Sequence, residues 1–192
     1  MKKILATLAI LAASTGAASA QDWAFEIYAG KALEGTLEYR TTDYDLDPGT
    51  AFGVGVYNQA NPAFEYGLDL MKTSRTYTGF DNDVDSLSAV AVIRFPIVKT
   101  GQTTVYAGVG AGVVQVSYVG TGGDEPYSGS DVVPAAQASV GAQVGLGGGS
   151  ALFAEAKYQK AVKNASIDSD ADSDVNQEFN GASVLFGFRQ DF

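Results

Sequence analysis

The chain has 192 residues, no histidine, no cysteine and a formal net charge of −10 at pH 7. The missing residue types exclude Ser-His and Cys-His catalysis, disulfide bonds and zinc sites built from imidazole or thiolate ligands. The acidic balance excludes nucleic acid as a partner, because phosphate binding requires Lys and Arg.

Residues 1–20 have the pattern of a secretory signal peptide, so they are excluded from the fold. A basic start precedes an apolar run and a small-residue cleavage site of the A-x-A kind. These features are Lys2 and Lys3, then Ile4–Ala13, then Ala18 and Ala20. The apolar run is too short to span a bilayer as a helix, which takes about 20 residues. We therefore expect an exported protein whose single domain is 21–192.

The rest of the chain alternates between polar and apolar residues, which predicts β-strands. In one run, for example, Val140, Ala142 and Val144 share a face opposite Gln143 and Gly145. Eight such runs are predicted: Trp23–Arg40, Gly49–Asn58, Phe64–Tyr77, Ser86–Ile97, Thr103–Val119, Val132–Gly147, Ala151–Val162 and Glu178–Phe192.

The first run has an alternative interpretation as a hairpin, since Glu34-Gly35 offers a turn, and this would give nine strands. An even number is expected for a bacterial single-chain barrel, so we favour one long strand.

The connections between the runs alternate in length. Tight turns are predicted at Ala60–Ala63, Val98–Gln102 and Gly147–Ser150, and long polar loops at Thr41–Pro48, Gly79–Asp85, Gly120–Asp131 and Lys163–Gln177. Short periplasmic turns and long external loops are typical of outer-membrane barrels. The sequence thus predicts an all-β, eight-stranded, antiparallel up-and-down transmembrane barrel with both mature termini in the periplasm.

The composition of the strand face opposite the apolar residues distinguishes a membrane barrel from a soluble one. A soluble barrel or sandwich places its apolar face inside. Here the opposite face carries Gly and charged residues, as expected for a crowded polar lumen of eight strands. The charged lumen set is Glu26, Glu65, Asp69, Arg94, Glu155, Lys157 and Arg189. The functional interpretation of this set is a gated ion path, and the structural interpretation, which we favour, is an ion-paired core.

The last run places Phe186, Phe188 and Phe192 on one face. This resembles the C-terminal strand signal recognised by the outer-membrane assembly machinery, although Gln190 stands where the pattern has an apolar residue. Phe192 is also expected to belong to the lower aromatic girdle, at the periplasmic interface of the membrane, together with Trp23, Phe25, Phe64 and Phe95.

The whole mature chain resembles the small outer-membrane β-barrel family related to the OmpA-like transmembrane domain and the opacity-type surface proteins. The resemblance rests on the order of four motifs. They are Trp23 with Tyr28-Ala29-Gly30, Val105–Gly112, Leu152–Gln159, and Gly187-Phe188-Arg189 with Phe192. It implies an eight-stranded barrel in the outer membrane of a Gram-negative bacterium, with a structural, adhesive or unknown role.

Acidic residues gather in the predicted loops. They are Asp43, Asp45, Asp47, Asp81, Asp83, Asp85, Asp124, Glu125, Asp131, Asp168, Asp170, Asp172, Asp174 and Glu178. The segment starting at Asp81 is not an EF-hand, because Ser86 and Val92 replace the required Gly and Glu. The alternating series Asp168, Asp170, Asp172 and Asp174 is a weak metal candidate, and a solvated loop is the favoured interpretation.

These features predict a non-enzymatic envelope protein without cofactors that presents acidic loops to the medium. Its expected partners are outer-membrane lipid, lipopolysaccharide and the assembly machinery, and it is expected to be a monomer. Two alternatives stay open, namely an adhesin or receptor acting through the loops and a narrow porin-like channel acting through the lumen.

Overall fold

The computed structural model describes residues 22–39, 42–78, 83–122, 125–162, 165–167 and 175–192. The predicted signal peptide and the series from Asp168 to Asp174 lie outside these residues. No helix in the described part of the chain is long and apolar enough to cross a membrane.

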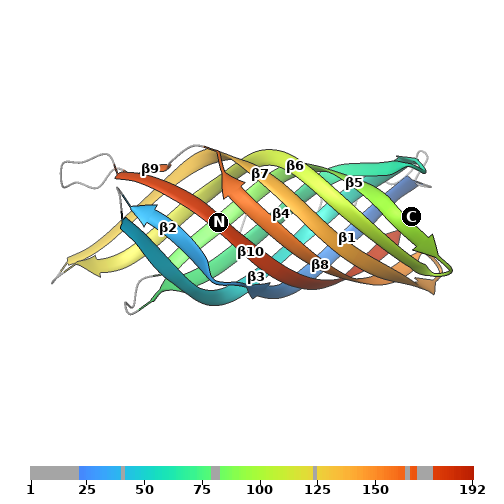
Figure 1. Ribbon diagram of the computed structural model, residues 1–192, viewed down its shortest axis with the longest axis horizontal. Helices are drawn as coiled ribbons and strands as arrows, with labels where there is room; N and C mark the ends of the chain where they lie inside the picture. Colours follow the sequence, from blue (N-terminus) through green and yellow to red (C-terminus); the bar gives the residue numbers. More distant parts are fainter. Residues whose placement is uncertain (1–21, 40–41, 79–82, 123–124, 163–164, 168–174) are drawn as a thin grey trace.

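The described chain forms a single ten-segment antiparallel sheet (Figure 1). Its strands are β1 Trp23–Ala32, β2 Gly35–Tyr39, β3 Thr42–Asn61, β4 Phe64–Tyr77, β5 Asp83–Thr100, β6 Thr103–Gly122, β7 Glu125–Gly147, β8 Ser150–Ala161, β9 Ala165–Ile167 and β10 Val175–Asp191.

The sheet closes into a barrel because β10 pairs with both β8 and β1, and β1 pairs onward with β3. Each remaining strand from β3 to β8 pairs with the next in sequence. Closure gives β1, β3, β4, β5, β6, β7, β8 and β10 a paired neighbour on each side, and hydrocarbon demands such pairing of a β-structure.

Ten segments occupy eight positions in the ring. Both β1 and β2 lie between β10 and β3, and they do not pair with each other. Likewise β8 and β9 both pair with β10. The eight-stranded prediction is therefore confirmed. The predicted first strand is one ring position interrupted at Leu33 and Glu34, and the hairpin alternative is wrong.

The predicted turns are present and even tighter than expected. Two residues each separate β3 from β4, β5 from β6, and β7 from β8. The turn between β7 and β8 requires glycine, because Gly147, Gly148 and Gly149 all have positive φ angles, at 92°, 63° and 79°. These turns and the C-terminus lie at the end of the barrel opposite β2 and β9 in Figure 1.

The predicted long loops are largely strands. β3 already begins at Thr42, β5 begins at Asp83, and β6 and β7 continue to Gly122 and from Glu125. Asp43, Asp45, Asp47, Asp83, Asp85, Glu125, Asp131 and Glu178 lie in these strands, while Asp81, Asp124 and the 168–174 series lie outside the described residues. The loop prediction was wrong for a physical reason. Where a strand extends past the lipid-facing apolar band of the barrel, both of its faces can be polar, so the sequence there shows no alternation of polar and apolar residues.

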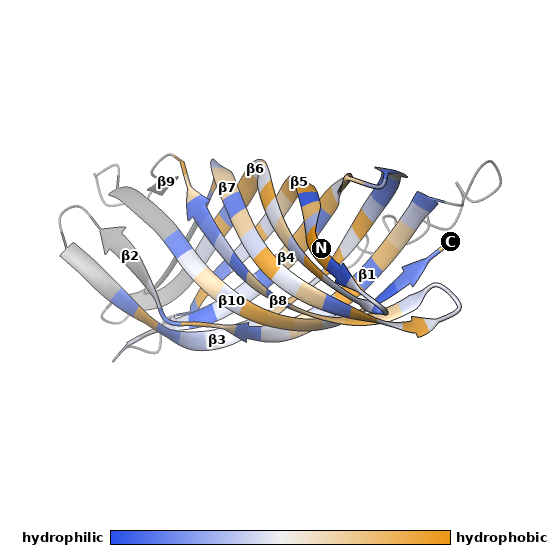
Figure 2. Cartoon of the chain, turned by 45° about the vertical axis from the view of Figure 1, so that its right-hand side comes forward, coloured by the Kyte–Doolittle hydropathy of each residue, from blue (hydrophilic) through white to orange (hydrophobic). Residues whose placement is uncertain are grey.

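The barrel is apolar outside and polar inside. The outward side chains of Ile27, Phe52, Leu68, Val109 and Phe186 are 48% to 65% exposed, although each is apolar. Figure 2 shows hydrophobic and hydrophilic residues interleaved along the strands. Contiguous exposure of this kind requires a lipid neighbour, because water would disfavour it strongly.

The predicted girdle residues lie at the turn end of the outer face. Trp23, Phe95 and Phe192 are exposed, and Phe25 and Phe64 are half-buried. The rings of Phe64 and Phe95 lie 6.4 Å apart between centroids. The N–H of Phe192 donates to the carbonyl of Trp23 at 2.8 Å, so the two ends of the ring meet here.

Candidate functional site: the barrel lumen

Two arginines and four carboxylates form a layer of ion pairs across the lumen near the turn end. Arg94 donates to Glu26 at 2.8 Å and to Glu155 at 2.9 Å. Arg189 contacts Glu65 at 2.9 Å and Glu26 at 3.2 Å. Asp191 completes the layer at 2.7 Å from the Arg189 Nε. These residues come from β1, β4, β5, β8 and β10, so the layer ties together opposite walls of the barrel.

Arg94 is the centre of this layer and is almost completely buried. Its guanidinium carbon lies 3.9 Å from the ring centroid of Tyr57 and 4.9 Å from that of Tyr106. The hydroxyl of Tyr106 also donates to Glu155 at 3.2 Å. A desolvated guanidinium between aromatic faces gains about 2 kcal/mol from each favourable cation–π contact. Arg94 is therefore held by charge and by the aromatic rings together.

Glycines on the inner face make room for these rings. A Cβ at Gly141 would lie 2.5 Å from the Tyr106 ring, and a Cβ at Gly67 would lie 2.5 Å from the Tyr57 ring. Because real Cβ contacts are never this short, alanine at either position has to displace a tyrosine that packs on or near Arg94.

We expect Gly141→Ala to lower the free energy of unfolding by about 1–3 kcal/mol, the usual cost of overpacking a filled interior. Gly145→Ala is the matched control, because Gly145 is on the same strand and face but its nearest neighbour would lie 3.6 Å from the new Cβ. Urea unfolding of both variants in lipid vesicles measures the difference. Equal stability of the two variants would show that Tyr106 is free to move.

A second polar layer lies deeper in the lumen. Asp69 accepts hydrogen bonds from Tyr28 and Lys157, and from Gln137 at 3.3 Å. Gln159 donates to Gln137 at 2.9 Å and to the Ser88 hydroxyl at 2.9 Å. The single carboxylate here is matched by one ammonium, so the layer is electrically balanced.

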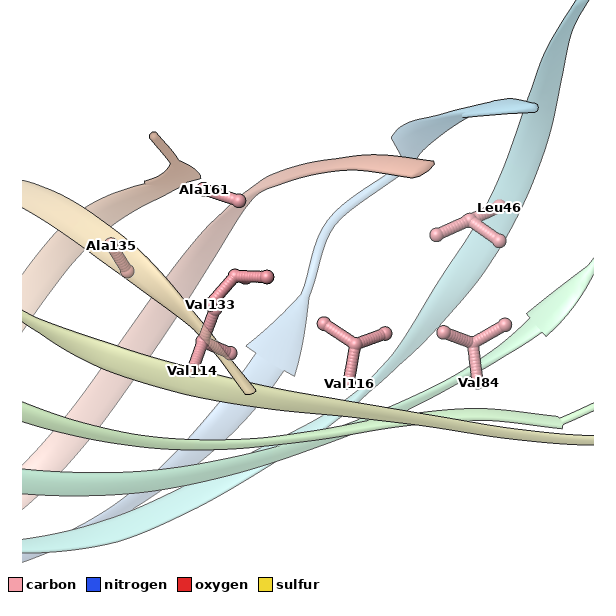
Figure 3. Close-up of a cluster of buried hydrophobic side chains, with 7 residues drawn as sticks. All are labelled: Leu46, Val84, Val114, Val116, Val133, Ala135 and Ala161. Atoms are coloured by element: carbon pink, nitrogen blue, oxygen red, sulfur yellow. The ribbon is translucent and has the colours of Figure 1, made fainter. Parts of the chain in front are cut away.

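An apolar layer follows toward the far end of the barrel. Its buried side chains come from β3, β5, β6, β7 and β8 and are drawn in Figure 3. They are Leu46, Val84, Val114, Val116, Val133, Ala135 and Ala161. Alternation alone did not predict apolar residues on the inner face. They fill the lumen without needing polar partners, and they disfavour water there.

A pocket of about 140 Å³ opens between the ion-pair layer and the turn end. The pocket is lined by Arg94, Arg189, Glu65 and Tyr106, and also by Lys99. Most of its charged groups are already engaged in ion pairs, so the pocket is a vestibule to the ion-pair layer.

The structure brings all seven predicted lumen residues inside the barrel. Six are buried, and the Glu65 side chain keeps 13% exposure beside the vestibule. Asp69 and Lys157 pair in the deeper layer, away from both arginines. Phe186, Phe188 and Phe192 lie on the outer face as predicted, outside the lumen. Ala18 and Ala20 lie outside the described residues.

Sequence reasoning missed several members of the two polar layers. They are Tyr28, Tyr57, Tyr106, Gln137, Gln159 and Asp191. All lie at inward-facing positions of their strands, so inward parity was a signal that could have found them. Five of the six are uncharged, because tyrosine and glutamine also supply the polar groups that a lumen uses.

Among the described residues, no group of three or more acidic side chains is placed to hold a metal ion. The metal candidates Asp168, Asp170, Asp172 and Asp174 lie outside those residues. On the outer surface, Lys72 forms an ion pair with Asp85 at 2.7 Å. Such an exposed pair contributes little to stability.

No protein-family model matches the sequence, and no curated protein matches it either. Solved structures do match the fold. Neisserial surface protein A is 13% identical, with a TM-score of 0.58 over 88% of this chain and 99% of that one. Ail, the attachment invasion locus protein of Yersinia pestis, is 18% identical, with a TM-score of 0.54 over 89% and 99%.

The outer membrane protease OmpT from Escherichia coli also matches, at 10% identity and a TM-score of 0.58 over 93% of this chain and 100% of that one. These identities establish a shared fold. By that fold, and by its apolar exterior and charged interior, the chain is an outer-membrane β-barrel protein.

Proposed function

We propose that this barrel is a non-enzymatic structural component of the outer membrane, monomeric and closed to ions, which displays an acidic surface to the medium. The observation that carries the proposal is the lumen filled by three successive layers. A structural barrel needs such filling, because an eight-stranded ring leaves only enough room for side chains.

The non-enzymatic part of the proposal rests on the available chemistry. The chain has no histidine or cysteine to act as base or nucleophile. The buried carboxylates Glu26, Glu155 and Asp69 are held by Arg94 and Lys157, and carboxylates fixed in this way are poorly placed to take up a substrate proton. The protease OmpT shares the fold, and a fold does not by itself carry an activity.

We expect no steady current from the purified barrel in a planar lipid bilayer. The ion-pair layer, the Asp69 layer and the apolar layer lie one after another, so opening one leaves the others closed. Arg94→Ala, which removes the central side chain of one layer, is therefore expected to remain non-conducting. A stable unitary current from the wild-type protein, in bilayers where a general porin conducts normally, would favour the channel alternative.

A second candidate function is adhesion, favoured by the strands that continue beyond the apolar band. The structure of Ail shows that this fold is used by an attachment protein, and Ail was also solved with a heparin analogue. Here Asp45, Asp47, Asp83 and Asp85 lie on the extended strands, so a sulfated polyanion would be repelled.

Cell attachment distinguishes the two candidates. Cells carrying the full protein are compared with cells carrying a barrel in which residues 120–128 are replaced by a short Gly-Ser turn. A structural role predicts equal attachment at equal surface amounts. Loss of attachment with the shortened hairpin would support an adhesin.

A further inference from the structure

A β-bulge on β5 turns one lysine into the vestibule, the pocket at the turn end of the lumen. Pro96 pairs with the inward-facing Tyr106 of β6, and the register then shifts so that Lys99 pairs with Thr104. The two residues between Pro96 and Lys99 both lie exposed on the outer face. In an unshifted strand Lys99 would share the outward face of Ile97, because side chains alternate. Bulges at barrel rims re-aim side chains in this way.

Lys99 has no protein partner in the vestibule. It lines the pocket and forms no ion pair or side-chain hydrogen bond with any residue that the structure describes. Thr104 lies between Lys99 and Gln143 in the strand ladder. The Thr104 hydroxyl and the amides of Gln143 and Gln59 line the same pocket and are equally uncommitted among the described residues. All of these groups donate hydrogen bonds, so this wall is suited to a carboxylate.

Asp191 lies on the opposite wall of the vestibule. Three strands separate β5 from β10 in either direction around the ring, namely β4, β3 and β1 on one side and β6, β7 and β8 on the other. The Oδ1 of Asp191 accepts from Arg189, whereas its Oδ2 has no partner in the described part of the chain, and the side chain is 52% exposed. The pocket is thus lined by one uncommitted ammonium and one uncommitted carboxylate oxygen, on opposite sides.

The other charges of the pocket limit what these two groups can bind. Arg94 and Arg189 are engaged by the carboxylates of the ion-pair layer, which has four carboxylates against two arginines. The field of this layer disfavours a simple anion on Lys99. The ammonium of Lys99 in turn disfavours a simple cation on Asp191. A molecule that carries both charges avoids both penalties.

We propose that the vestibule binds a small zwitterion such as a free α-amino acid, with its carboxylate on Lys99 and its ammonium on Asp191. The pocket has a volume of about 140 Å³. A protein cavity of about 150 Å³ takes benzene, and alanine has the same number of non-hydrogen atoms as benzene. Short turns of outer-membrane barrels face the periplasm, so the ligand comes from that side. The inference goes beyond the structural role and requires no passage through the lumen, because the pocket ends at the ion-pair layer.

The test compares alanine with its two singly charged halves. The full mature chain is refolded in detergent micelles, and the amide NMR signals of Lys99, Thr104 and Gln143 are followed during titration with L-alanine, propionate or ethylamine. Propionate lacks the ammonium of alanine, and ethylamine lacks its carboxylate. We expect saturable shifts with L-alanine, and at least tenfold weaker binding of propionate and of ethylamine.

Two changes at the bulge separate the charge of the lysine from its direction. Lys99→Met removes the ammonium. Val98→Lys combined with Lys99→Val keeps the composition but moves the ammonium to the adjacent, outward-facing position. Both variants should bind L-alanine at least tenfold more weakly than the wild type. Lys31→Met, on the outer face of β1, is the matched control and should bind normally.

On the opposite wall, Asp191→Asn removes the charge but keeps an oxygen that can accept from Arg189, and it should also weaken alanine binding at least tenfold. Heat-modifiable gel migration checks that every variant forms the barrel. The proposal is overturned by the absence of saturable shifts with L-alanine, or by normal alanine binding in the variant with the exchanged lysine. Equal affinities for alanine and propionate would overturn the zwitterion and the role of Asp191.

Discussion

Replacing Arg94 by methionine is expected to lower the free energy of unfolding by about 3–5 kcal/mol, the cost of breaking one side of a buried ion pair. The substitution leaves Glu26 and Glu155 without their shared guanidinium in a layer that has more carboxylates than arginines. It also removes the cation between the Tyr57 and Tyr106 rings. Urea unfolding in lipid vesicles measures the loss, with the fluorescence of Trp23, the single tryptophan, as the probe.

Two further variants separate charge from general damage. Lys31→Met makes the same type of change at an exposed position and should cost little. Glu26→Gln combined with Arg94→Met should recover part of the loss, because one uncompensated charge is gone. A cost below about 1 kcal/mol for Arg94→Met would mean that lumen water relaxes the carboxylates, and the layer would then be weakly coupled.

Replacing Phe192 by alanine is expected to reduce the amount of protein in the outer membrane strongly, and to leave precursor or degraded protein in the periplasm. Phe192 follows β10, the strand that closes the ring by pairing with β1 and β8. Its side chain is 61% exposed on the outer face, so it makes few contacts in the finished barrel. We propose that it acts mainly in recognition by the assembly machinery.

The same variant, refolded from urea into detergent micelles, should therefore still give a heat-modifiable barrel. Phe52→Ala is the matched control, because Phe52 is similarly exposed to lipid but lies on β3. It should reach the membrane normally. Wild-type membrane levels of the Phe192 variant would reduce this residue to a member of the aromatic girdle.

Several features followed from local chemistry and could be predicted from the sequence. The period of two placed Ile27, Leu68 and Val109 on one face and Glu26, Asp69 and Arg94 on the other, because a strand alternates its side chains. The short Gly and Asn-Pro segments located the turns. A closed ring then followed, since an open sheet edge in lipid leaves backbone groups unsatisfied.

Which residues meet across the lumen depends on strand register and barrel tilt, and a sequence pattern contains neither. Arg94 reaches Glu26 on β1 and Glu155 on β8, although 68 and 61 residues separate them in the chain. Asp69 shares their parity, yet it lies in a different layer and pairs with Lys157. The positions at which the strands end also depended on the tertiary structure. Beyond the apolar band, a strand stays extended because it pairs with its neighbour, and the hydropathy of the sequence does not reveal that pairing.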